Sequence, residues 1–126
     1  MGCFYTGFDY KNRKNGYFKI GETSGKTPAA RLSQIRTGDS FQCLGYLILH
    51  NESKPERLFV ESYVRMMMSK KYEHTQNDHF LYRIESKERK YPQAFEMANE
   101  ALEYAKTACS LANIDYDIGT KTYKRS

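Results

Sequence analysis

The sequence lacks several features that would place it at once in a common functional class. No apolar run approaches the roughly 18 residues that a membrane-spanning helix needs. The first residues contain no basic stretch followed by an apolar one, so no secretory signal is expected. The chain also has no internal repeat and no low-complexity tract. These absences exclude a membrane-spanning class and predict a cytoplasmic protein.

Cysteine is scarce, and its spacing excludes the common metal and redox motifs. The chain has three cysteines, too far apart to form a C-x-x-C pair: Cys3, Cys43 and Cys109. The histidines have no H-E-x-x-H spacing, so no zinc site is expected. Residues 21–27, GETSGKT, resemble a phosphate-binding P-loop, but only three residues separate Gly21 from Gly25, one fewer than that motif requires. We therefore expect three buried thiols in a reducing compartment.

The sequence does contain enough apolar bulk for one folded domain, together with an excess of positive charge. The chain has 126 residues, including 11 tyrosines and seven phenylalanines, so a core can form without disulfides. Lys and Arg total 20 and Asp and Glu total 15, which gives a formal net charge of +5. This sign suits contact with a phosphate backbone. The candidate nucleic-acid-binding residues are Lys26, Arg36, Arg57, Arg65, Lys70 and Lys71.

The first part of the chain predicts a β-hairpin and then a helix. Residues 3–8 and 17–21 are short, aromatic-rich segments, and Asn15-Gly16 before the second of them is a turn signal. A helix follows, with its cap, its first residue and its end signal at Thr27, Pro28 and Gly38.

The rest of the chain predicts two more strands and two more helices. Ser53 and Glu56 have capping-box spacing, which predicts a helix over residues 54–71. Its expected apolar stripe is formed by Leu58, Phe59, Tyr63 and Met67. The other expected elements are strands at 41–50 and 79–84 and a helix at 92–112. We therefore expect an α/β fold of the α+β type, with helices over a small sheet in one domain, residues 1–115, and a loose basic tail, residues 116–126.

Five polar residues on these elements suit hydrolysis of a phosphodiester. Tyr17 and Lys19 are two apart on one strand and therefore face the same side of the sheet. A tyrosine or lysine can move a proton from the attacking water, and an arginine can stabilise charge on the phosphate. A carboxylate can hold Mg²⁺ or Mn²⁺. The candidate catalytic residues are Tyr5, Tyr17, Lys19, Arg31 and Glu61, of which Glu61 is the candidate metal ligand.

The order of these motifs resembles the GIY-YIG endonuclease superfamily. FYTG lies near the start, YFKIG follows, Arg31 comes ten residues after Gly21, and a helix carries Glu61. The segment KIGETSGKTPAARLSQIRTG is most similar to a phage-associated branch whose second motif reads KIG. That branch also has a strand like the one at Asp78-His79-Phe80. The resemblance covers about residues 3–84.

The resemblance implies a fold, a chemistry and a role for each matched residue. The fold is a small antiparallel sheet, opening with a hairpin and flanked by three helices. Tyr5 matches the tyrosine of the first motif, Arg31 the catalytic arginine and Glu61 the glutamate that binds one divalent ion. Family members cleave DNA with a tyrosine-assisted water. Low sequence specificity is expected of this domain alone, and a dimer is a possible assembly.

The chain departs from the family at several of these positions. Its first motif reads GCFY, and Lys19 stands where classical members have tyrosine, so either Lys19 or Tyr17 takes that role, or the role is lost. Asn77 matches a late asparagine of the family by position alone, and His79 replaces an aromatic residue.

Two other interpretations remain open from the sequence. Arg57 and Arg65 lie four residues on either side of Glu61, a spacing typical of an ion-pair ladder on a helix surface. In this interpretation, the domain is a non-catalytic relative of the family that has kept the fold and binds nucleic acid or inhibits another protein. In a third interpretation it is an interaction domain that uses the helix at residues 92–112.

Overall fold

The residues that the structure describes form an antiparallel sheet and two helices, in an α+β arrangement. The computed structural model describes residues 2–10, 15–25, 28, 42–50, 53–72, 79–83, 92–119 and 123–124. The elements are β1 (Gly2–Tyr10), β2 (Asn15–Thr23), β3 (Gln42–Leu49), α2 (Lys54–Ser69), β4 (His79–Arg83), α3 (Pro92–Leu111), β5 (Tyr116–Gly119) and β6 (Tyr123–Lys124). The helix expected after Thr27 lies outside the described residues.

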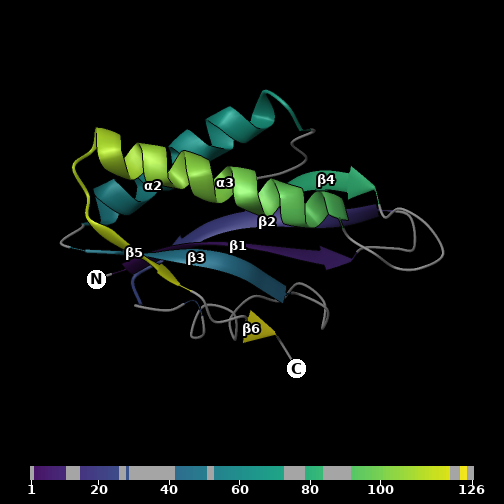
Figure 1. Ribbon diagram of the computed structural model, residues 1–126, viewed down its shortest axis with the longest axis horizontal. Helices are drawn as coiled ribbons and strands as arrows, with labels where there is room; N and C mark the ends of the chain where they lie inside the picture. The colour runs from purple at the N-terminus through teal and green to yellow at the C-terminus, as the bar shows by residue number, and fades with distance from the viewer. Residues whose placement is uncertain are drawn as a thin grey trace.

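The strands are arranged in the order β4-β2-β1-β3-β5, and β6 also pairs with β3. Every pairing is antiparallel, which confirms the opening hairpin of β1 and β2. The predicted turn at Asn15-Gly16 is wrong, because both residues belong to β2: Gly16 pairs with Tyr10 and Asn15 with Arg83. Figure 1 shows α2 and α3 on the same side of the sheet.

The helices cover one face of the sheet and form the main core with it. Even-numbered residues of β1 and β2 point to this face, since side chains alternate along a strand. Phe4, Phe18 and Ile20 are fully buried there against Val60 and Val64 of α2 and against small residues of α3. Small side chains let the backbone of α3 approach the sheet closely, and five of its alanines are buried in this core: Ala94, Ala98, Ala101, Ala105 and Ala108.

The opposite face of the sheet holds a second, smaller cluster of buried residues. Cys3 and Tyr5 of β1 contribute to it, together with Cys43 and Tyr46 of β3, and Ile48 packs beside them. All three cysteines are buried free thiols, as expected. The odd-numbered residues of β1 therefore face away from α2 and α3.

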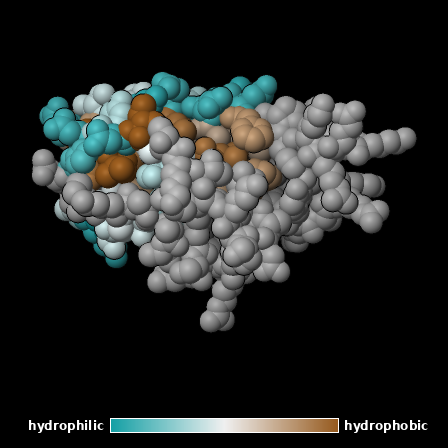
Figure 2. Space-filling view, turned by 60° about the horizontal axis from the view of Figure 1, so that its bottom comes forward, coloured by the Kyte–Doolittle hydropathy of each residue, from teal (hydrophilic) through white to brown (hydrophobic). Residues whose placement is uncertain are grey.

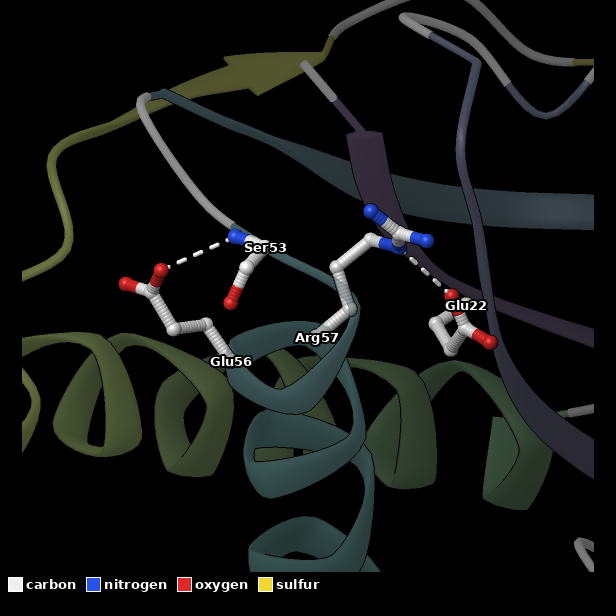
Figure 3. A network of polar contacts seen from close by, with 4 residues as sticks. All are labelled: Glu22, Ser53, Glu56 and Arg57. Carbon is white, nitrogen blue, oxygen red and sulfur yellow. Dashed lines mark hydrogen bonds and ion pairs between the residues drawn. The ribbon is translucent and has the colours of Figure 1, made fainter.

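Helix α2 begins where the sequence predicts, but a different side of the helix faces the core. The backbone N–H of Ser53 donates to Glu56 Oε1 at 2.8 Å, which confirms that half of the capping box (Figure 3). The predicted apolar stripe is wrong: Leu58 and Phe59 are 42% and 41% exposed. The side of α2 that faces the core instead carries Val60, Glu61, Val64 and Met68.

Within the segment predicted as a loose tail, the described residues form two short strands. Residues 116–119 form β5 along β3, and residues 123–124 form β6 on the same strand. Helix α3 ends at Leu111, one residue from the predicted end, and Asn113 with φ 55° turns the chain toward β5. Among the described residues, no helix is long and apolar enough to cross a membrane.

Candidate active site

The two strand motifs meet in one cross-strand pair. Tyr5 of β1 lies directly opposite Gly21 of β2. A Cβ atom added at Gly21 would be 2.5 Å from Tyr5 Oη and 2.6 Å from Tyr5 Cζ, so the ring covers this glycine. Tyr5 is only 1% exposed. The glycine of the second motif is therefore required by the tyrosine of the first.

Lys19 lies beside this pair on the same face of the sheet. It precedes Gly21 by two residues in β2 and pairs with Gly7 of β1, so its side chain shares the face of Tyr5. Lys19 is half-buried. Tyr17 pairs with Asp9, two residues further along, but its side chain lies outside the described residues. Tyr5, Gly21 and Lys19 thus lie together on one face of the sheet.

A second tyrosine, which the sequence analysis missed, extends this row. Tyr46 lies in β3, between β1 and β5. It pairs with Tyr5 of β1 on one side and with Gly119 of β5 on the other. A Cβ at Gly119 would be 2.2 Å from the Tyr46 ring atoms Cε2 and Cζ. The Tyr5 ring therefore covers a glycine of β2 and the Tyr46 ring covers a glycine of β5, on opposite sides of the β1–β3 pair. The only sequence signal is one glycine, Gly119, in a polar segment, and its pairing with Tyr46 is non-local.

Glu61 lies on the core-facing side of α2 and is 8% exposed. Its Oε1 atom accepts a hydrogen bond from Arg65, one turn later in the helix. Arg57, one turn earlier, instead donates to Glu22 of β2 at 2.8 Å (Figure 3). Their side chains are 12% and 17% exposed, so this is a mostly buried ion pair. The Arg65 half of the predicted ladder is therefore present, and Arg57 reaches a carboxylate of the sheet.

The structure separates Glu61 from the tyrosine face by the sheet itself. Val60 and Val64, next to Glu61 on α2, pack on the face opposite Tyr5 and Lys19. The Arg57–Glu22 pair also lies on the α2 side, because Glu22 is an even-numbered residue of β2, and it joins α2 to the end of β2 next to Gly21. Arg31 and Asn77 lie outside the described residues, as do Lys26 and Arg36.

A divalent metal fits this site only as an ion with one protein carboxylate. In the part of the chain that the structure describes, no group of three or more His, Cys, Asp or Glu residues is placed to bind a metal. Glu61 is a buried carboxylate with one oxygen engaged by Arg65. Mg²⁺ binds through one or two carboxylates and retains several waters, so a single-carboxylate site is chemically sufficient.

Most of the basic residues predicted to bind phosphate on α2 are paired with carboxylates. Arg57 contacts Glu22 and Arg65 contacts Glu61. Lys71 donates to Glu100 of α3 at 2.7 Å, and this hydrogen bond raises the pKa of the Lys71 ammonium. Lys70 is exposed. The positive charge of this helix is therefore largely balanced within the fold.

A separate hollow at the end of α3 includes none of the predicted residues. It is lined by Cys109, Ser110, Asn113, Ile114, Asp115 and Tyr116.

Comparisons of the chain with protein-family models, with curated proteins and with solved structures found no match.

Proposed function

We propose that the protein is a metal-dependent endonuclease of the GIY-YIG type that hydrolyses phosphodiester bonds in DNA. The observation that carries the proposal is the seating of Tyr5 on Gly21, with Lys19 next to them on the same face. The two motifs are 16 residues apart in the sequence, and their glycine and tyrosine fit one another in space. A cytoplasmic location and a DNA partner are part of the same proposal.

Each residue then has a defined task. Lys19 or Tyr17 accepts the proton of the attacking water, with the hydroxyl of Tyr5 aligning that water. Arg31 stabilises the negative charge that grows on the phosphate oxygens. Glu61 would hold the divalent ion, which would supply Lewis-acid stabilisation of that charge. Because α2 packs on the face opposite Tyr5 and Lys19, the phosphate would have to lie at the end of β2 for both sides to reach it. The Arg57–Glu22 pair keeps the first turns of α2 beside Gly21, and Glu61 follows Arg57 by one turn.

A plasmid-nicking assay with Mg²⁺ or Mn²⁺ tests this assignment. Arg31→Ala and Glu61→Gln are expected to lower the cleavage rate by about 10²–10³. Arg65→Gln is the matched control, because it removes the other partner of the Glu61 ion pair and leaves the carboxylate in place. It is expected to keep cleavage within about tenfold of wild type. Wild-type protein that never nicks with any divalent ion would contradict the proposal.

The Glu61–Arg65 contact also supports a second candidate, a non-catalytic binding module. In that case Glu61 stabilises the helix and has no metal to hold. Glu61→Gln and Arg65→Gln then lower the melting temperature by similar amounts, and neither changes any nucleic-acid cleavage. DNA binding without nicking, together with this pattern of melting temperatures, would favour the second candidate.

A further inference from the structure

The outward side of α2 presents an apolar face to the surface. Leu58, Phe59 and Met66 are 42%, 41% and 50% exposed. Tyr63 is half-buried, and its ring lies 6.2 Å from that of Phe59. Ser62 lies between these residues on the helix surface and is exposed. We call these five residues the α2 outer face. Figure 2 views the molecule from the sheet side, where apolar side chains also reach the surface between hydrophilic ones.

The charges at the two ends of the α2 outer face are opposite. Its five residues carry no charge, although 28% of the chain is charged. Glu56 lies in the first turn of α2, and the exposed Lys70 caps its last turn. The two residues are 14 positions apart, which corresponds to about four helical turns, so both lie on the side of the outer face. The pattern is acidic, apolar, then basic along one line.

We propose that the α2 outer face binds a second copy of this chain, with the two α2 helices antiparallel. A two-fold axis near Tyr63, midway between Glu56 and Lys70, makes the face complementary to itself. Glu56 then meets Lys70 of the partner subunit at both ends of the interface. Phe59 meets Met66 of the partner subunit, a favourable sulfur–aromatic contact. Antiparallel helices also place opposite ends of their dipoles together.

The size of the face determines how strong this association is. Partly exposed side chains on one helix supply on the order of 400 Å² per subunit, half the area of a standard stable interface. The dimer is therefore weak and concentration-dependent rather than obligate. The inference does not depend on the proposed function, because none of the five residues of the α2 outer face is a candidate catalytic or nucleic-acid-binding residue. Lys70, a candidate phosphate contact, enters only through the charge pairs at the ends of the interface.

Sedimentation equilibrium over roughly 1–500 μM protein tests the association. Wild-type protein is expected to shift from monomer toward dimer across this range, and Phe59→Lys to remain monomeric. Ile118→Lys is the matched control: Ile118 is an exposed apolar residue on β5, 57% exposed, and its replacement should leave the dimer intact. A wild-type monomer at the highest concentration, or Phe59→Lys dimers as strong as wild type, would overturn the proposal.

A charge exchange tests the antiparallel register. Lys70→Glu places two acidic residues together at each end and should weaken the dimer at least tenfold. Adding Glu56→Lys restores an opposite-charge pair and should recover most of that loss. Because Glu56 also accepts the Ser53 N–H, thermal melting must show that the double variant is folded. A folded double variant no better than Lys70→Glu overturns this arrangement.

Discussion

The ring of Tyr5 lies on Gly21, directly across the β1–β2 pair. Tyr5 of β1 also pairs with Tyr46 of β3, and the Tyr46 ring covers Gly119 of β5. The two tyrosine rings thus lean away from each other, each over a residue without a side chain. The contact with Gly21 determines where the Tyr5 hydroxyl lies. Both glycines are sensitive to substitution, because any added side chain would overlap a tyrosine ring.

Gly21→Ala is expected to destabilise the fold by about 1–3 kcal/mol, because the added methyl group would overlap the Tyr5 ring. Urea unfolding measures this loss. The double variant Tyr5→Ala/Gly21→Ala has no ring to displace, so its cost should be less than the sum of the single variants. Additive costs would contradict a direct contact between the two residues.

Gly119→Ala is the matched control for catalysis. It forces the same overlap, with Tyr46 in place of Tyr5. If Tyr5 acts in the chemistry, Gly21→Ala should lose nicking activity while Gly119→Ala, once folded, retains it. Equal loss in both folded variants would assign these glycines a role in stability alone.

Breaking the pair between Arg57 and Glu22 is expected to cost about 1–3 kcal/mol, because a mostly buried charge would be left without its partner. Arg57→Gln and Glu22→Gln should each lower the urea midpoint. In the double variant both charges are gone, so the total loss should be clearly smaller than the sum. A purely additive result would show that the two side chains do not stabilise one another in solution.

DNA binding should weaken steeply with salt if the protein contacts the phosphate backbone. Four phosphate contacts correspond to a slope of about −3.6 for log K against log salt concentration. Filter binding between about 50 and 200 mM salt measures this slope. Arg57→Gln should leave it unchanged, since Arg57 is already paired with Glu22. A flat dependence would exclude the phosphate backbone as the partner.

The sequence predicted the elements of the fold more reliably than how their side chains are oriented. The helix start at Ser53 and Glu56 was recognisable because a capping box is local. The buried side of α2 was not, because Val60, Val64 and Met68 repeat at the same spacing of four residues as Phe59, Tyr63 and Met67 of the predicted stripe. Two apolar stripes on one helix are equivalent until tertiary packing selects one.

Pairing between strands far apart in the sequence explains the other differences between the predicted and the observed structure. Residues 116–119 are polar enough to suggest a loose tail, yet they form an edge strand because β3 offers unpaired backbone groups. Asn15-Gly16 has turn chemistry, but pairing with β1 and β4 draws both residues into β2. The Tyr5–Gly21 pair was predictable only as two motifs of the resemblance. Its geometry depends on the strand register, which a motif does not specify.

The final prediction concerns the pH dependence of stability and follows from Cys43. Burial raises the pKa of the Cys43 thiol to about 11, and the backbone of Gly45 opposes this rise only in part. In the unfolded chain the thiol ionises near its ordinary value of 9.0. The unfolded state therefore loses a proton first as the pH rises. The contribution of Cys43 to stability is complete below pH 9 and is lost between about pH 9 and pH 11.

Urea unfolding of wild type and Cys43→Ala at about pH 8 and about pH 10.5 measures this effect. Other groups titrate in this range, but they are shared by both proteins, so the difference between the two curves isolates the thiol. Wild type should lose more stability than Cys43→Ala on going to the higher pH. Cys109→Ala is expected to behave in the same way, because burial raises the pKa of Cys109 to about 11 as well. If the gap between wild type and Cys43→Ala is the same at both pH values, the Cys43 thiol ionises equally in the folded and unfolded chains, and its burial does not oppose ionisation.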